Sequence, residues 1–171
     1  EGKLLEHIGV NVSSLQLQND DFLNTLNNVL HQTKIDPKWL EIELTESYLA
    51  TDADHALSIL RMLRDLNINI AIDDFGTGYS SMSYLQKLSI TRLKIDKSFI
   101  DDLPISAESI AITRAIIALA NTFGLSITAE GVENRDQLTF LQQEGCHEIQ
   151  GYYYSKPLTL NELKAFIDDM Q

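Results

Sequence analysis

The sequence predicts an α/β fold, a TIM-type (β/α) barrel of which about six of the eight β/α units are present. Short β-branched runs alternate with longer amphipathic stretches along the chain, and such alternation predicts a parallel sheet with helices outside it. The phosphate-binding signatures G-x-G-x-x-G and G-x-x-x-x-G-K-[ST] are absent from the sequence, which favours a barrel over a doubly wound nucleotide-binding sheet. Eight units need about 250 residues, and the chain has 171.

The first half of the chain predicts three strands, each followed by a helix. The strands are expected at residues 8–12, 40–44 and 68–72. Residues 15–31 carry apolar side chains at helical spacing, and this helix ends before Asp36-Pro37, because proline does not continue a helix. A second helix is expected from a cap at Thr51 or Asp52 to residue 67.

The second half repeats the pattern. Three more strands are expected at residues 92–95, 126–129 and 147–152. The helices are expected at residues 80–87, 107–123, 135–144 and 160–170. Gly124 ends the helix before it, and Thr159 or Asn161 begins the last one. The sequence has no linker-like or low-complexity segment, so residues 1–171 are expected to belong to one domain. They would form its C-terminal part, and the first strands and helices of the domain are expected upstream of Glu1.

The composition excludes several classes of protein. A net charge of −12 argues against binding of polymeric nucleic acid, which depends on clustered Lys and Arg. The sequence has neither a run of about 20 apolar residues nor a signal peptide. We therefore expect no membrane contact in this segment, and we expect a cytoplasmic location. The single cysteine, Cys146, excludes an intramolecular disulfide, and any metal should be held by oxygen atoms.

Polar side chains stand at the end of every expected strand. A barrel enzyme assembles its active site from the C-terminal ends of its strands, so these positions are candidates for catalysis and binding. In chain order they are Asn11, Glu43 with Glu46, Asp73 with Asp74, Lys94 with Asp96, Glu130 with Glu133, and Gln150.

The grouping of these acids predicts a metal site. Any single acid at a strand end has a simpler explanation, since it commonly caps the next helix or faces solvent. Carboxylates crowded at one rim, however, would repel one another and take up protons unless cations lay between them. Adjacent carboxylates such as Asp73 and Asp74 point in alternate directions on a strand and can serve two neighbouring ions. Oxygen-rich ligand sets suit Mg²⁺ or Mn²⁺.

Six segments together resemble the EAL family, bacterial phosphodiesterases that linearise the second messenger cyclic di-GMP. The resemblance covers residues 9–157 in order and spacing. The segments are Val10-Asn11-Val12-Ser13, Glu43-Leu44-Thr45-Glu46-Ser47, Asp73-Asp74-Phe75-Gly76-Thr77-Gly78, Lys94-Ile95-Asp96, Glu130-Gly131-Val132-Glu133 and Gln150-Gly151-Tyr152. The expected reaction is hydrolysis of cyclic di-GMP to linear pGpG.

The resemblance implies a two-metal site with Mg²⁺ or Mn²⁺. Asn11, Glu43 and Asp73 would bind one ion, and Asp73, Asp74 and Glu130 would bind the second. Asp74 and Glu130 would also take part in catalysis. The ions would activate a water that attacks phosphorus directly.

Lys94 is implied to orient or help to activate the attacking water. A structural role, in an ion pair with Asp96 or Asp74, is the alternative. Carboxylates around a buried lysine raise its pKa, so Lys94 should be a charge-stabilising donor and a poor general base. The other matched residues have implied supporting roles: Gln150 in substrate binding, Glu46 in anchoring the loop after Asp74, and Asp96 and Glu133 beside them.

The loop that follows Asp74 contains Gly76 and Gly78. These glycines allow a flexible turn that moves over the substrate, although a plain strand-to-helix turn explains them equally well.

The chain departs from the family in one respect. No Glu-Ala-Leu tripeptide precedes Asn11, and its glutamate would be a further metal ligand, so the motif is expected upstream of Glu1. A catalytically inactive cyclic di-GMP sensor and a dimerisation or regulatory module remain alternatives. A homodimer, and fusion to upstream sensory or GGDEF-type domains, are the expected assemblies.

Overall fold

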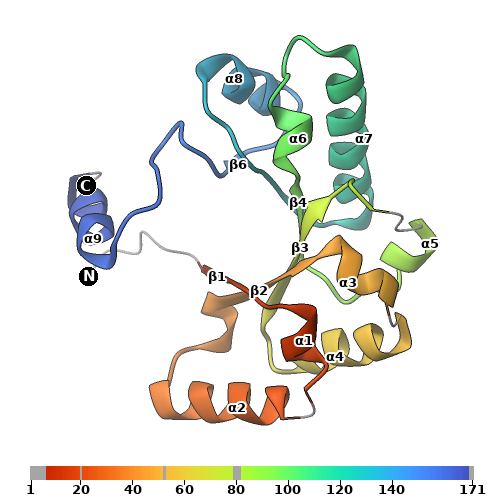
Figure 1. Cartoon of the computed structure of the whole chain (residues 1–171), viewed down its shortest axis with the longest axis vertical. Helices are drawn as coiled ribbons and strands as arrows, with labels where there is room; N and C mark the ends of the chain where they lie inside the picture. The colour runs from red at the N-terminus through yellow and green to blue at the C-terminus, as the bar shows by residue number, and fades with distance from the viewer. Residues whose placement is uncertain (1–6, 20, 52, 79–81, 170–171) are drawn as a thin grey trace.

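A curled parallel sheet forms the centre of the computed structural model, which describes residues 7–19, 21–51, 53–78 and 82–169. The strands are β1 (Ile8–Asn11), β2 (Leu40–Thr45), β3 (Asn69–Phe75), β4 (Arg92–Ile95), β5 (Ser126–Ala129) and β6 (Glu148–Ile149). They lie in the order β1-β2-β3-β4-β5-β6, and every neighbouring pair is parallel. A doubly wound sheet would reverse its strand order. The sequential order and the curvature seen in Figure 1 confirm an incomplete barrel.

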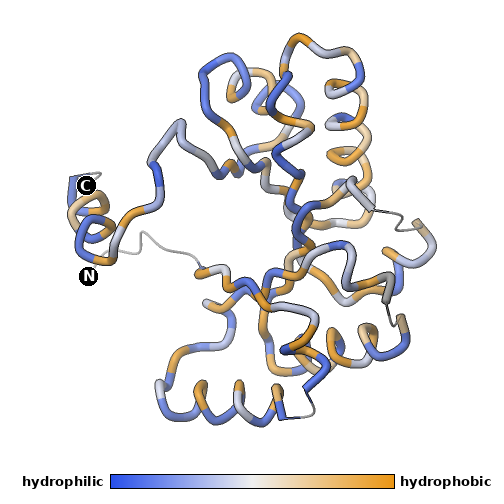
Figure 2. The backbone as a smooth tube through the Cα atoms, in the orientation of Figure 1, coloured by the Kyte–Doolittle hydropathy of each residue, from blue (hydrophilic) through white to orange (hydrophobic). Residues whose placement is uncertain are grey.

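Helices cover the convex side of this sheet (Figure 1). They are α1 (Ser14–Leu17), α2 (Phe22–Thr33), the 3-10 helix η1 (Pro37–Trp39), α3 (Glu46–Thr51), α4 (Ala53–Asp65), α5 (Met82–Leu85), α6 (Lys97–Ile100), α7 (Ala107–Phe123) and α8 (Arg135–Gln143). Along α2 and α7, hydrophobic and hydrophilic residues alternate (Figure 2), as expected for helices with one face toward the sheet. Among the described helices, none has the length and apolarity to span a bilayer.

Most predicted elements are present, and the second half agrees closely. Strands 92–95 and 126–129 and helix 107–123 have the predicted limits. The predicted helix 15–31 is wrong, because two helices, α1 and α2, occupy this region. The break follows from Asn19, whose side-chain oxygen accepts a 2.9 Å hydrogen bond from the Asp21 N–H. Such local side-chain bonds compete with the helix.

Other limits differ in detail. Helices α3 and α6 were not expected, and the predicted strand 147–152 is reduced to β6. Thr51 is the last residue of α3, whereas Asp52, residues 80–81 and Met170 lie outside the described residues. Thr159 directly precedes α9 (Leu160–Asp169). Its hydroxyl donates to Glu162 Oε2 at 2.7 Å, and its N–H donates to the same atom at 2.8 Å.

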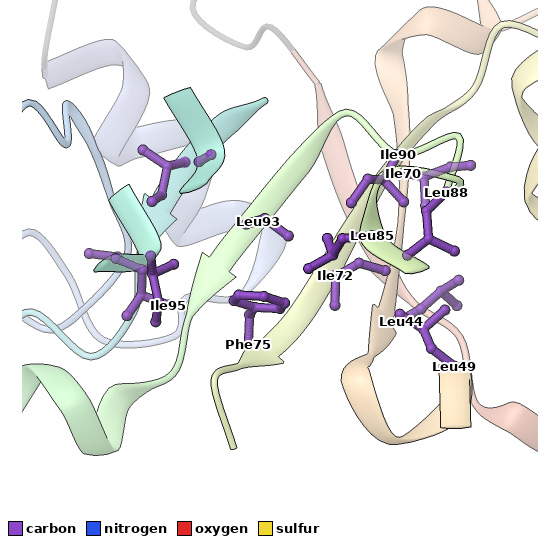
Figure 3. Close-up of a cluster of buried hydrophobic side chains, with 14 of the residues drawn as sticks. Leu44, Leu49, Ile70, Ile72, Phe75, Leu85, Leu88, Ile90, Leu93 and Ile95 are labelled. Atoms are coloured by element: carbon purple, nitrogen blue, oxygen red, sulfur yellow. The ribbon is translucent and has the colours of Figure 1, made fainter. Parts of the chain in front are cut away.

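The hydrophobic core lies between the sheet and the helices. It takes alternate residues of the central strands, including Leu44, Ile70, Ile72, Leu93 and Ile95, all fully buried. Figure 3 shows these side chains together with Leu49, Phe75, Leu85, Leu88 and Ile90. Successive residues of a strand point to opposite faces. The residues between the core positions therefore face the concave side of the sheet, and there they are mostly polar.

The two edge strands leave the sheet open. β1 and β6 are the first and last strands of the order, and Ile8 and Val10 of β1 are 53% and 42% exposed. Helix α9 lies across this opening, away from the helices that cover the sheet (Figure 1). The six strands thus form a curled sheet that is open between β1 and β6.

Candidate active site

A buried lysine lies at the centre of the concave face. The Lys94 ammonium group lies 2.6 Å from Glu43 Oε2, 3.1 Å from Asp73 Oδ1 and 2.7 Å from Glu130 Oε1. The lysine side chain is only 4% exposed, and the three carboxylate side chains are 12–15% exposed. Glu43 is on β2, Asp73 is on β3 and Glu130 follows β5, so residues 87 positions apart in the chain converge on one ammonium group.

These contacts decide the protonation state of Lys94. Burial lowers the pKa of this ammonium, but the hydrogen bonds that it donates to Glu130 and Glu43 and the charges of Glu130 and Asp73 outweigh burial, so the pKa lies well above its ordinary value. Lys94 is therefore a cation and a hydrogen-bond donor at any physiological pH. It is a poor general base and a good group for holding negative charge.

A β-bulge brings Asp73 and Asp74 to the same site. Ile72 pairs with Leu93 and Phe75 pairs with Ile95, so β3 has one residue more than β4 between these pairs. Asp74 takes a left-handed backbone conformation, with φ of 54°, and its N–H donates to Asp73 Oδ1 at 3.1 Å. Strict alternation would separate the two carboxylates; the bulge corrects that expectation by turning Asp74 toward its neighbour.

Asp73, Asp74 and Glu130 form a group that suits a metal ion. Each offers a carboxylate oxygen within 4.8 Å of the other two. Burial and the charges of Asp73 and Asp96 raise the pKa of Asp74. Burial also raises the pKa of Glu130 to about 7, against the opposing effect of Lys94. Repulsion of this kind is relieved by a divalent cation, and carboxylate oxygens are ligands that Mg²⁺, Mn²⁺ and Ca²⁺ prefer.

The raised pKa of Glu130 predicts that metal binding depends on pH. A ligand carboxyl must lose its proton to bind the ion, and with a pKa of about 7 this group is mostly protonated at pH 6 and mostly ionised at pH 8. We expect the dissociation constant for Mn²⁺ to be roughly tenfold larger at pH 6 than at pH 8. Isothermal titration calorimetry at the two pH values measures the ratio. Equal constants would contradict the assignment, and Glu130→Gln should flatten the dependence.

Asn11 and Glu43 are neighbours on the first two strands. They are paired in the β1–β2 register, and in a parallel sheet paired residues share a face. A Cβ atom at Gly9 would lie 1.8 Å from Glu43 Oε1. Glycine at position 9 therefore makes room for the Glu43 side chain to lie over β1. This requirement was not predicted from the sequence, because it depends on a neighbour 34 residues away.

The Glu46 side chain holds the loop after β3 through the backbone N–H groups of that loop. Its Oε2 atom accepts hydrogen bonds from the Gly76 N–H at 2.9 Å and the Gly78 N–H at 3.1 Å, and the residue is 4% exposed. Gly76 has φ of +104°, and a Cβ at Gly78 would lie 2.8 Å from Glu46 Cδ. Both glycines are thus required by conformation or by close approach.

We expect Glu46→Ala to lower turnover by about tenfold to 100-fold, because the loop next to Asp74 would lose its anchor and small displacements of reacting groups are costly. Glu46→Gln is the matched control, since its amide oxygen can still accept from Gly76 and Gly78. Steady-state kinetics of both variants gives the comparison. Equal activity of the alanine and glutamine variants would show that the loop does not depend on this anchor.

Gln150 and Glu133 lie beside a cavity at the edge of the site. The cavity has a volume of about 360 Å³ and is lined by Lys97, Gly131, Glu133, Gln150, Gly151, Tyr152, Ser155, Lys156 and Pro157. Glu133 pairs with Lys97 at 2.5 Å. Lys156 lies 5.8 Å from the centre of the Tyr152 ring. The cavity is within the range of small-ligand pockets.

The remaining candidate, Asp96, caps a helix. It is the N-cap of α6 and accepts a 3.0 Å hydrogen bond from the Ser98 N–H, with a further bond from the Ser98 hydroxyl. The ion pairs of Lys94 are with Glu43, Asp73 and Glu130, so the alternative pairing with Asp96 or Asp74 is wrong. The structure therefore brings Glu43, Asp73, Asp74, Lys94 and Glu130 together. Asp96 lies beside Asp74, and Glu133 lies at the cavity with Lys97.

Comparisons with known proteins agree with this geometry. Residues 3–157 match the family model described as "EAL domain". The chain is 40% identical over 160 residues to "Cyclic di-GMP phosphodiesterase NbdA" of Pseudomonas aeruginosa, a match that covers 94% of this chain and 20% of NbdA. The chain spans about a fifth of the length of such curated relatives.

Solved structures show the same fold. "PaMucR Phosphodiesterase, c-di-GMP complex" superposes with a TM-score of 0.89 at 41% identity, covering 92% of this chain and 64% of that one. "Klebsiella pneumoniae BlrP1 pH 9.0 manganese/cy-diGMP complex" gives a TM-score of 0.83 at 29% identity, covering 90% and 40%. Relatives of this chain thus include proteins solved with manganese and with the cyclic dinucleotide.

Proposed function

The chain belongs to the EAL domain family, and from this membership we propose that it supplies most of the active site of a metal-dependent phosphodiesterase that hydrolyses cyclic di-GMP to linear pGpG. The observation that carries the proposal is the convergence of Glu43, Asp73 and Glu130 on Lys94, with Asp74 turned into the same group. Such a set of oxygen donors matches a phosphodiester hydrolase that uses divalent ions.

We propose two ions, Mg²⁺ or Mn²⁺. Asn11, Glu43 and Asp73 would hold one, and Asp73, Asp74 and Glu130 would hold the other. Ions bound there would lower the pKa of the attacking water and stabilise the leaving alkoxide. The manganese in the related BlrP1 structure supports this choice.

The chain's own residues would orient the reaction. Lys94 donates to Glu43 and Glu130 and so fixes carboxylates from distant strands; with substrate bound, the same cation would stabilise charge on the phosphate and orient the water. Glu46 would keep the loop after β3 in its productive conformation through Gly76 and Gly78. Gln150, beside the cavity, would contact the substrate.

We further propose that this chain is the C-terminal part of a longer catalytic domain. The curated relatives are about five times as long, and β1 and β6 leave an opening in the barrel. Two upstream β/α units, one with the Glu-Ala-Leu glutamate, would close it. Sensory or GGDEF-type domains further upstream, a homodimer and a cytoplasmic location complete the proposal.

Chromatographic detection of pGpG tests the proposed reaction. The full-length protein that carries this chain should convert cyclic di-GMP to pGpG with Mn²⁺ or Mg²⁺, and EDTA should abolish conversion because the carboxylates alone do not activate water. If micromolar protein binds cyclic di-GMP but forms no product, the protein is a sensor of cyclic di-GMP and the proposed reaction is wrong. Neither binding nor product would favour a regulatory module.

A further inference from the structure

A second buried cation lies beneath Lys94 on the same strand. Arg92 is 8% exposed. Its Nε atom donates to Glu41 Oε2 at 2.9 Å, and its Nη1 atom donates to Thr128 Oγ1 at 2.9 Å and to Glu148 Oε2. Glu41 itself is 3% exposed and its other oxygen lies 3.2 Å from His7 Nε2. None of these residues takes part in the proposed reaction.

The Arg92 cluster repeats the pattern of the site one layer lower. Arg92 is two residues before Lys94, Glu41 is two before Glu43, and Thr128 is two before Glu130. Residues two apart on a strand share a face. In both layers a cation on β4 thus reaches a carboxylate on β2 and an oxygen on, or just after, β5; the lower layer adds Glu148 on β6.

A small residue on β3 leaves the space that this contact needs. β3 lies between β2 and β4, and Ala71 is paired with Glu43 on one side and with Arg92 on the other. Ala71 is fully buried. Because its side chain is a single methyl group, the Arg92 guanidinium can extend across β3 to Glu41.

Stability alone is a weak reason for such a cluster. Desolvation of a buried ion pair consumes much of its Coulombic gain, and apolar residues of similar size often stabilise as well. What the guanidinium adds is geometry, since its planar fork binds partners in fixed directions. Arg92 joins β2 to β6, strands separated by three others in the sheet order.

We propose that Arg92 is a positioning residue for the active site. By holding Glu41 on β2 and Glu148 on β6 at once, it sets the curvature of the sheet. That curvature fixes how far Glu43 lies from Glu130, the two carboxylates that meet at Lys94 in the layer above. The inference deepens the proposed function and rests on it for the identity of the reaction, but not for the metal site.

Mn²⁺ binding and kinetics of Arg92 variants test this inference in the full-length protein. We expect Arg92→Met to weaken Mn²⁺ binding by about tenfold to 100-fold, as for other residues that support metal ligands from behind. The value of kcat for cyclic di-GMP should fall about tenfold or more, while KM changes less than about threefold, because Arg92 does not touch the substrate. Arg92→Lys keeps the charge, but the lysine cannot reach both carboxylates. Its Mn²⁺ affinity and kcat should therefore lie between those of the wild type and those of Arg92→Met.

Two further variants keep the test decisive. Arg114→Met removes another arginine–carboxylate pair, the 2.7 and 2.9 Å contacts with Glu144 between α7 and α8, and should leave Mn²⁺ affinity and kcat unchanged. Glu148→Gln alters a side chain that is 48% exposed, so this variant should fold even if Arg92→Met does not, and should weaken Mn²⁺ binding severalfold.

The outcomes separate this inference from the proposed function. Folded Arg92→Lys and Glu148→Gln proteins with wild-type Mn²⁺ affinity and kcat would overturn the positioning role. Equal losses in the Arg114→Met control would also overturn it, since the effect would then be general destabilisation. If the wild-type protein does not cleave cyclic di-GMP but Arg92→Met still weakens Mn²⁺ binding, the positioning role stands and the proposed reaction fails.

Discussion

Lys94→Met is expected to lower turnover of cyclic di-GMP by about 10²–10³-fold, the usual effect of removing a preorganised charge from an active site. Lys94 contacts three carboxylates from different parts of the sheet, and methionine of similar length fills the space without the charge. The carboxylates would then repel one another. Steady-state assays with saturating Mn²⁺ measure the loss of kcat.

The stability of this variant gives a second readout. Without metal, loss of the ammonium removes an effect that lowers the pKa of Glu130, so more of this carboxyl should be protonated near neutral pH. A raised pKa in the folded state means that the folded state binds more protons than the unfolded state above about pH 4.5, and stability falls as the pH rises through the folded pKa. Lys94→Met should therefore lose more thermal stability at pH 8 than at pH 6.

Lys38→Met is the matched control for Lys94→Met. Lys38 is an exposed lysine that pairs with Asp36 at 2.7 Å, and surface pairs of this kind contribute little to stability. We expect its turnover and its pH profile of unfolding to match the wild type. A Lys94→Met protein with turnover within threefold of the wild type would reduce Lys94 to a structural cation.

The sequence was sufficient for the alternation of strands and helices, because a buried face imposes its period on each element. The agreement was best where the stop signal was strong, as at Gly124 after α7. The helix predicted over residues 15–31 failed because the period of apolar residues continues through Asn19, whose side-chain bond to the Asp21 N–H breaks the helix. Periodicity does not report such local competition.

The site was predictable in its membership and less so in its contacts. Strand ends and motif spacing placed Glu43, Asp73, Lys94 and Glu130 together, because parallel strands bring their ends to one rim. The bulge at Asp74 was not predictable, since an extra residue in β3 is defined only by its pairing with β4. The partners of Lys94 likewise depend on how far the sheet curls, which no single segment encodes.

Asp73→Asn is expected to lower turnover by about 10²–10³-fold while leaving the melting temperature within a few degrees of the wild type. Asparagine keeps an oxygen that can accept the 3.1 Å hydrogen bond from the Asp74 N–H, so the bulge is preserved. The substitution removes a negative charge that raises the pKa of both Asp74 and Glu130. Mn²⁺ binding should weaken because a ligand of both proposed ions is lost.

A measurement of the Glu130 pKa distinguishes two roles for Asp73, that of a metal ligand and that of a structural acid. If Asp73 acts through its charge, Asp73→Asn should lower the pKa of Glu130 from about 7, detectable by NMR titration of the metal-free protein, while the fold is retained. Asp65→Asn, at the exposed end of α4, is the matched control and should change neither turnover nor this titration. Parallel losses of turnover and stability in Asp73→Asn would instead show that the carboxylate stabilises the bulge, because loss of a charge needed only for catalysis would leave the stability of the fold unchanged.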